Sequence, residues 1–384
     1  MPASTPRSHV PAILLVVLEV EPPAPGHLIS ALATAGFRVG LLTPAPGIRP
    51  ETAAWRGISV FPLGDSRSAS HVSARLAGAM AELRPVLVVP CDGPALAVLQ
   101  TIVQRGHGGS GKPTAGMIAT LIDSLGDPCC FAALLLHDDA LALVRGLGLP
   151  TVASRHARTA AAIRQAASDL GWPAHLGPAF DEVSRSGSLC HNPREAEAAL
   201  ARLFRRPSRL AALMHRLTDR DWDAAAAGVA VREVIPGSPA TLITVAWRGQ
   251  ILATAPRFGG PVTGRDRPSA INGMETTAAR YIATTGASGF LGFTFTVATD
   301  SGLPYFTGLH QHPDRLCGPE SGPVLADALA AVFQVSPGQT RPVLRAGETR
   351  CPSERTGLPA RPRLDGRAVA ARLLGLMPGP ATAL

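Results

Sequence analysis

The sequence contains almost no lysine. Of its 36 basic residues, Lys112 is the only lysine and the others are arginines, and against 28 acidic residues they give a net charge of +8. Most arginines stand singly, and aromatic residues make up only 4% of the chain. Proteins that bind nucleic acid usually carry a basic stripe interleaved with aromatic side chains. Because no such stripe is present, we predict that nucleic acid is not a partner.

Paired cysteines and long apolar runs are also missing. The six cysteines include no Cys-x-x-Cys pair and no regular spacing, which indicates reduced thiols and argues against a cysteine zinc site. The longest N-terminal apolar run, Ala12 to Leu18, is far shorter than the roughly 20 residues that a membrane-spanning helix needs, and it lacks a small-residue cleavage site. We therefore expect a cytoplasmic protein without a membrane partner.

The length and composition predict a globular protein of several domains. A chain of 384 residues corresponds to two or three units at roughly 150 residues each. The order of predicted elements places an α/β domain at residues 1–122, a small region at 123–220 and a strand-rich α+β region at 221–335. Residues 336–384 are dense in proline, glycine and arginine, and we predict that they form a loosely packed tail.

The first region alternates predicted strands and helices, which is typical of a parallel sheet. The apolar run at residues 13–18 has the length and branching of a strand that is buried on both faces. A helix follows this strand, and Gly36 is expected to end that helix. The predicted elements after this strand are helix 27–35, strand 37–42, helix 72–83, strand 86–90 and helix 94–105.

The rest of the chain is predicted to contain both element types without an internal repeat. The predicted helices are 131–146, 157–170, 193–203, 273–284 and 322–333, with one more at 366–376 in the tail. The predicted strands are 149–152, 229–234, 241–246, 250–253, 290–297 and 304–307.

One glycine-rich segment imitates a phosphate-binding loop. Gly106 to Pro113 fits the spacing of that loop up to its last position, where Pro113 replaces the hydroxyl residue that binds magnesium. A phosphate loop also follows a buried strand, whereas a predicted helix leads into this segment. We therefore interpret it as a flexible loop.

Several segments, in order, resemble those of one known superfamily. The segment Glu233 to Gly237 closes a β-branched strand and is similar to its hinge. Gly289 to Phe295 and Asp300 to Tyr305 resemble its closing strands. Upstream, Gly148 to Val152 and Gly171 to Ala179 resemble the strand starts of its nucleotide-clasping subdomain. The likeness is to the ATP-grasp superfamily of carbamoyl-phosphate-synthase-like carboxylate-amine ligases; it spans about residues 10–315 and implies a divergent or degenerate member.

This resemblance implies an ATP-grasp fold, of mixed α/β and α+β class, with a Rossmann-like pre-ATP-grasp domain at the front. It also implies ATP and magnesium as cofactors and a reaction in which a carboxylate forms an acyl-phosphate that an amine captures. The small-molecule carboxylate or amine would be the substrate. Glu233, Val234 and Pro236 would border the adenine pocket.

The sequence departs from the family at the positions that hold phosphate. The two cations of the family fall near His137 and on Gly177, and the acid that reaches the ribose falls on Pro239. A histidine is mostly uncharged at neutral pH and a glycine has no side chain, so neither replaces a permanent cation well. The catalytic residues consequently stay unknown.

The metal-binding positions have also changed. The two metal carboxylates of the family fall on Thr294 and Gly308, and the residues that follow become His310 and His312. Alternate residues of a strand share a face, so His310 and His312 could together hold a transition metal such as zinc or nickel, with His137 or Asp314 as a third ligand. The competing interpretation is a pair of solvated histidines at a strand end.

These departures leave several functions open. An ATP-dependent ligase is one, and a catalytically inactive pseudoenzyme that binds a metabolite or a protein partner is another. The segment from Gly26 to Val39 also resembles the first βαβ unit of two-domain sugar transferases, which gives a third. A homodimer is the base-rate expectation for the assembly.

Overall fold

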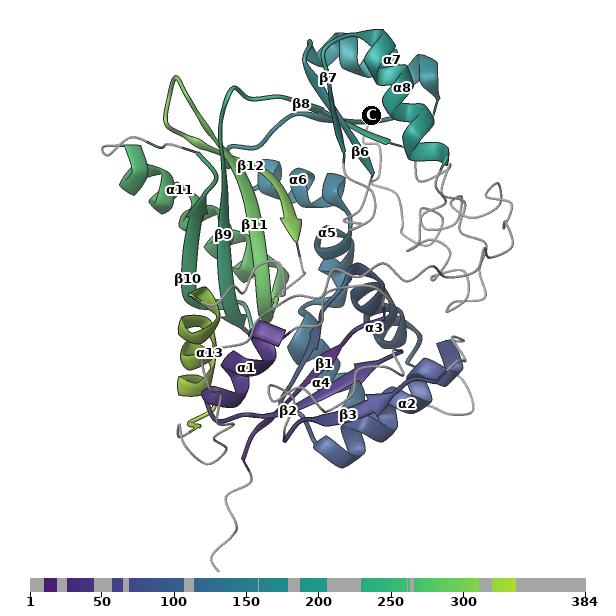
Figure 1. The fold of residues 1–384 in the computed structure, drawn as a ribbon, viewed down its shortest axis with the longest axis vertical. Coiled ribbons are helices and arrows are strands. Elements are labelled where there is room, and N and C mark those ends of the chain that lie inside the picture. The colour runs from purple at the N-terminus through teal and green to yellow at the C-terminus, as the bar shows by residue number, and fades with distance from the viewer. Residues whose placement is uncertain are drawn as a thin grey trace, which may run out of the picture.

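The computed structural model describes residues 10–18, 26–44, 57–64, 69–106, 114–157, 159–178, 187–205, 229–260, 262, 266–310 and 320–335. These residues form three four-stranded sheets. The glycine-rich loop after Gly106, His312, Asp314 and the predicted tail helix lie outside the described residues. Figure 1 shows the first sheet at one end of the molecule and a smaller sheet at the other.

The N-terminal region is a parallel sheet in the order β3-β2-β1-β4, as the alternation of elements predicts. Its strands are β1 (Ala12–Val16), β2 (Arg38–Thr43), β3 (Ser59–Pro62) and β4 (Leu87–Pro90). Every residue of β1 is buried, because alternate side chains contact different cores on the two faces. The sequence analysis did not predict β3.

Helices cover both faces of this sheet. They are α1 (Gly26–Thr34), α2 (Ala69–Leu83), α3 (Gly93–Arg105) and α4 (Ala115–Leu125). Gly36 follows α1 with a positive φ of 98°, which confirms its predicted role in ending that helix. The Asp92 carboxylate begins α3 by accepting the N–H groups of Ala95 and Leu18, each at 2.7 Å. Helix α4 was not predicted.

The smallest sheet, here called the clasp sheet, is antiparallel and has the order β5-β8-β6-β7. Its strands are β5 (Ser154–Ala157), β6 (Ala174–Pro178), β7 (Ser188–Cys190) and β8 (Val229–Glu233). Helices α7 (Ala160–Leu170) and α8 (Pro193–Arg205) pack on one face and enclose a separate apolar core. Figure 1 shows these two helices on the outer side of the sheet and α6 (His137–Gly146) beneath it.

The third sheet, here called the large sheet, is antiparallel with the order β10-β9-β11-β12. Its strands are β9 (Gly237–Trp247), β10 (Gln250–Phe258), β11 (Gly289–Ala298) and β12 (Pro304–His310). Helix α11 (Asp266–Thr285) packs on one face, where Tyr281 meets Phe293 and Phe306. Helix α13 (Ser321–Val332) covers part of the other face. The domain limits at residues 122, 220 and 335 stay predictions.

Two of the predicted elements near residue 140 are wrong. The single helix predicted at 131–146 is two helices, α5 (Phe131–Leu135) and α6 (His137–Gly146), preceded by a short 3-10 turn at Pro128–Cys130. Leu136 interrupts them because its backbone is extended, with φ −104° and ψ 129°. The interruption lets α6 begin a new first turn at His137.

The strand predicted at 149–152 is also wrong. This segment forms one bridge to β12, in which the Pro150 carbonyl and the Val152 N–H both bond to Phe306 at 3.0 and 3.2 Å. The clasp sheet starts later, at Ser154, and the helix predicted from residue 157 starts at Ala160. The segment therefore pairs with the large sheet before the chain enters the clasp sheet.

Among the described residues, no single helix combines the length and apolar character that a membrane span requires. One bent pair, Ala115–Leu125 with Pro128–Leu135 at 51°, would meet both criteria if taken together.

We predict that Gly237→Ala destabilises the protein. A β-carbon at residue 237 would overlap the Val297 carbonyl where β9 begins beside β11. Forcing these backbones apart should lower the free energy of unfolding by about 1–3 kcal/mol in a urea titration. Gly78→Ala is the matched control, because Gly78 lies exposed in α2 with open space around it and should gain about 0.5–1 kcal/mol. Equal effects of the two changes would contradict the prediction.

Candidate functional site

A three-residue linker joins the clasp sheet to the large sheet. Strand β8 ends at Glu233 and β9 begins at Gly237. Glu233 pairs twice with Ala153: its N–H donates to the Ala153 carbonyl at 2.9 Å, and its Oε2 accepts the Ala153 N–H at 3.1 Å. At the other end, the Pro236 carbonyl accepts the N–H of Thr299 at 3.0 Å. The linker is therefore fixed at both ends, and Val234 lies outside every strand ladder.

The side of the clasp sheet away from α7 and α8, here called the clasp face, is polar. Alternate residues of a strand point to opposite faces, and Val229, Val231 and Leu176 point into the core under the helices. The cross-strand partners Ser154, Arg232 and His175 consequently lie together on the clasp face. The members of this face among the described residues are Ser154, His156, His175, Gly177, Leu189, Ala230 and Arg232.

Asp138, in the first turn of α6, contacts this face. The Ser154 hydroxyl donates to Oδ1 of Asp138 at 2.7 Å, and Nδ1 of His156 lies 3.4 Å from Oδ2. Burial raises the pKa of the Asp138 carboxyl, but the hydrogen bonds from His156 and Ser154 and the charge of Arg232 outweigh it, so the pKa is lowered. Asp138 is therefore ionised at neutral pH and holds α6 against β5.

His175 supplies no charge to the clasp face. Burial, followed by the nearby charge of Arg232, lowers the pKa of its imidazole to about 4. A β-carbon at Gly177 would lie 3.3 Å from Cε1 of this ring, and one at Gly187 would overlap it. The neutral imidazole thus lies over the position where the ATP-grasp resemblance expects a lysine.

The His137 ring lies beside Gly308, as the His175 ring lies beside Gly177. A β-carbon at Gly308 would lie 3.2 Å from Nδ1 of the buried His137 ring. The His310 ring packs edge-on against His137, with 6.1 Å between the ring centres. Beside them, the Thr294 hydroxyl donates to the Gly308 carbonyl at 3.0 Å and accepts from the Thr307 hydroxyl at 3.1 Å. The structure thus brings His137 and His310 together.

These groups do not fit a magnesium ion. Magnesium in proteins is usually bound through one or two carboxylates together with phosphate and water. The described strands of the large sheet contain no aspartate or glutamate, and their cation Arg257 donates to the Ser321 hydroxyl at 3.0 Å. No three histidine, cysteine or acidic side chains gather as metal ligands in the described part of the chain. Zinc or nickel at His310 with His312 stays a prediction.

The sequence analysis found some of the residues of this region and missed others. It placed His137, Gly177, Thr294 and Gly308 at the phosphate and metal positions. Asp138, His156, His175 and Arg232 were not predicted as residues of the site. The available signal was weak: of the three short strands only 174–178 alternates apolar with polar residues, whereas strand 154–157 has three consecutive polar residues and strand 229–233 begins with three apolar ones.

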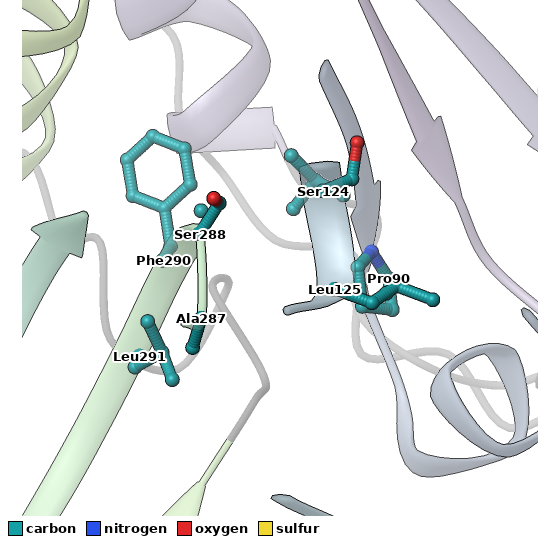
Figure 2. Close-up of a pocket in the computed structure, with 9 residues that line it drawn as sticks. Pro90, Ser124, Leu125, Ala287, Ser288, Phe290 and Leu291 are labelled. Atoms are coloured by element: carbon teal, nitrogen blue, oxygen red, sulfur yellow. The ribbon is translucent and has the colours of Figure 1, made fainter. Parts of the chain in front are cut away.

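A small cavity lies elsewhere, between β4, the end of α4 and the start of β11 (Figure 2). Its volume of about 10 Å³ suits roughly one water molecule. In Figure 2, Pro90, Ser124 and Leu125 face the residues from Ala287 to Leu291 across it. The Ser288 hydroxyl donates to the Asp123 carbonyl at 2.6 Å and accepts the Arg248 N–H at 2.8 Å. This site therefore joins two packed regions and is too small for a nucleotide.

Comparison with solved structures identifies the fold that these three sheets form. An L-amino acid ligase from Bacillus licheniformis matches with a TM-score of 0.52 and 13% identity, over 86% of this chain and 78% of that one. An N5-carboxyaminoimidazole ribonucleotide synthetase from Thermus thermophilus matches with a TM-score of 0.53 and 16% identity, over 85% and 80%. The fold is that of the ATP-grasp superfamily.

A third ATP-grasp structure agrees with these two. The N5-carboxyaminoimidazole synthase from Aspergillus clavatus, solved with ADP and 5-aminoimidazole ribonucleotide, has a TM-score of 0.54 and 13% identity, over 86% and 78%. No protein-family model matches the sequence, and a sequence search of curated proteins gives no match. At these identities the likeness establishes the ATP-grasp fold alone, as the order of the sequence segments implied.

We predict that His175 makes stability fall with pH below neutrality. Between pH 6.5 and 4 an unfolded chain protonates this imidazole and the folded protein does not, so stability is lost as pH falls through that window. The loss should reach up to about 3 kcal/mol. Urea titrations across this range should give a flatter profile for His175→Gln. His191→Gln, at an exposed histidine, should keep the wild-type slope; a flat profile there would contradict the assignment.

We also predict that Gly308 and His137 are energetically coupled. Gly308→Asp should lower the free energy of unfolding by about 1–3 kcal/mol, because the new side chain meets the His137 ring. In a His137→Ala background the same change should cost clearly less, as a double-mutant cycle by urea titration would measure. Gly116→Asp, at an exposed position early in α4, is the control and should be nearly neutral. Additive effects of the two changes would exclude the coupling.

Proposed function

We propose that this protein uses the ATP-grasp scaffold to bind a small metabolite between two lobes, one built on the clasp sheet and the other on the large sheet, and does not carry out Mg-ATP-dependent ligation. The observation that supports this is the His137 imidazole packed against Gly308, where the resemblance expects a metal carboxylate. Around it the described groups are hydroxyls and imidazoles.

The charge available for a triphosphate is the second argument. Polyphosphate with magnesium needs several cations over the phosphates and carboxylates around the metal. Among its described residues the clasp face has one permanent cation, Arg232. Asp138 lies close enough to interact electrostatically with this charge. Such a face would bind a triphosphate poorly.

The packing beside two glycines supports a site that has adapted to another ligand over a site that has only lost its function. At both Gly177 and Gly308 an imidazole packs against the small residue. A side chain lost without compensation would leave a cavity, whereas at both positions an imidazole ring fills the space beside the glycine. Selection for another ligand accounts for both replacements.

An ATP-dependent ligase is the second candidate. The fixed linker with Glu233 and the likeness of the fold to a ligase and a synthetase favour it. Such an enzyme would form an acyl-phosphate from a carboxylate and transfer the acyl group to an amine, with metal ligands from outside the described residues. Cytoplasmic location and a homodimer stay predictions for either candidate.

We predict that calorimetric titration with Mg-ATP gives no saturable heat and that ADP formation stays at the background rate with mixed carboxylates and amines. The physical reason is the shortage of cations and carboxylates described above. Saturable Mg-ATP binding that Glu233→Ala abolishes and Glu233→Gln keeps, together with turnover, would establish the ligase instead. Glu233→Gln is the control because its amide oxygen can still accept the Ala153 N–H.

A further inference from the structure

We propose that the large sheet binds an uncharged polyhydroxyl compound, such as a sugar or a cyclic polyol, on the face that is turned away from α11. The binding surface, here called the hydroxyl face, consists of Thr241, Thr294, Thr296, Tyr305 and Thr307. This inference rests on the proposed function, since it names the class of metabolite that the scaffold would bind.

Strand register brings these hydroxyls together. Thr294 of β11 is the cross-strand partner of Thr241 on β9, and Thr296 of β11 is the partner of Tyr305 on β12. Directly paired residues of neighbouring strands lie on the same side of a sheet. Phe295, between the two threonines of β11, packs in the core that the sheet shares with α11. Because alternate residues of a strand point to opposite sides, both threonines point away from α11.

The side of the sheet away from α11 changes character along the strands. Near α13 it is apolar, because Ile243, Val245 and Phe290 pack in the core shared with that helix. Further along the same strands, Thr241 and Thr294 take these positions, and both are only partly buried. Figure 1 shows α13 at the end of the strands that is remote from the clasp sheet. The hydroxyls therefore begin where the cover of α13 ends.

These hydroxyls keep capacity for further hydrogen bonds. Each hydroxyl has one donor and two acceptor lone pairs. Thr307 donates to Thr294 at 3.1 Å, and Thr294 donates to a backbone carbonyl of β12 at 3.0 Å. Thr307 thus keeps both lone pairs and Thr294 keeps one. Within the described part of the chain, the hydroxyls of Thr241, Thr296 and Tyr305 form no hydrogen bond. The face consequently offers both donors and acceptors.

The chemistry of the hydroxyl face favours an uncharged ligand. Ligand hydroxyls donate and accept, whereas a phosphate or carboxylate only accepts and an ammonium group only donates. The described strands of this sheet carry no acidic side chain. Their cation, Arg257, lies on the edge strand β10 with its guanidinium bonded to Ser321 of α13, and β9 separates it from Thr296. A charged ligand would lose hydration here without an opposite charge to replace it.

The test compares uncharged polyols with their charged analogues on the full chain. Glucose, ribose and myo-inositol are the uncharged probes, and each is paired with its own monophosphate. Cyclohexanol tests for binding through apolar surface alone. Dissociation constants come from ligand-observed NMR titrations at constant ionic strength. We expect saturable binding of at least one uncharged probe, and tighter binding of that probe than of its monophosphate or of cyclohexanol.

Three variants assign the binding to the hydroxyl face. Thr296→Val should weaken the binding of the polyol by about three- to tenfold, because a hydrogen bond between neutral groups is lost. Thr296→Ser keeps the hydroxyl and should keep most of the affinity. Thr254→Val is the matched control: Thr254 lies on β10 of the same sheet, but its hydroxyl donates to Glu275 of α11, so its loss should leave polyol binding unchanged. If Thr296→Val fails to fold by circular dichroism, Thr241→Val takes its place.

Three results would overturn the inference: no saturable binding of any uncharged probe, binding of its monophosphate or of cyclohexanol at least as tight as that of the polyol, or equal losses in the Thr296→Val and Thr254→Val variants. These results differ from a failure of the proposed function, which would appear as Mg-ATP turnover whatever the probes do. Absence of turnover together with any of the three results would remove this ligand class and leave the metabolite-binding scaffold.

Discussion

The first turn of α6 holds the two lobes together, and the site depends on it. His137 packs against Gly308 of the large sheet, while Asp138 binds Ser154 of the clasp sheet. Two consecutive residues of one helix thus contact both lobes, because Leu136 breaks the preceding helix and lets α6 begin there. A continuous helix through residue 136 would rotate these side chains away from one of their partners.

The same turn explains how the scaffold could change its ligand without losing its shape. Imidazoles fill the space beside Gly308 and Gly177, the positions where the ATP-grasp resemblance expects charged side chains, so these positions are well packed. Burial lowers the pKa of His175 to about 4, so this ring is neutral in the folded protein and avoids the cost of burying an unpaired charge. The chain has the ATP-grasp fold without the charges that the resemblance expects at these positions, which agrees with the principle that function resides in sites built on folds.

Much of the fold could be predicted from the sequence, and less of the site. The apolar run of β1 and the glycine that ends α1 identified the leading parallel sheet, because strand and helix periods are local properties. The break at Leu136 was not predictable, since no proline or glycine marks it. The segment at 149–152 has the composition of a strand, and only its pairing partner Phe306 determines that it forms a single bridge.

The sequence by itself determined that the permanent charges expected at Gly177, His137, Thr294 and Gly308 are absent, because residue identity alone decides whether a side chain can carry charge. Only the tertiary structure decided what replaces them. The contacts of His137 with Gly308 and of His175 with Gly177 and Gly187 depend on strand register and on the start of α6. Register is set by pairing between segments distant in the chain, so no local pattern specifies it.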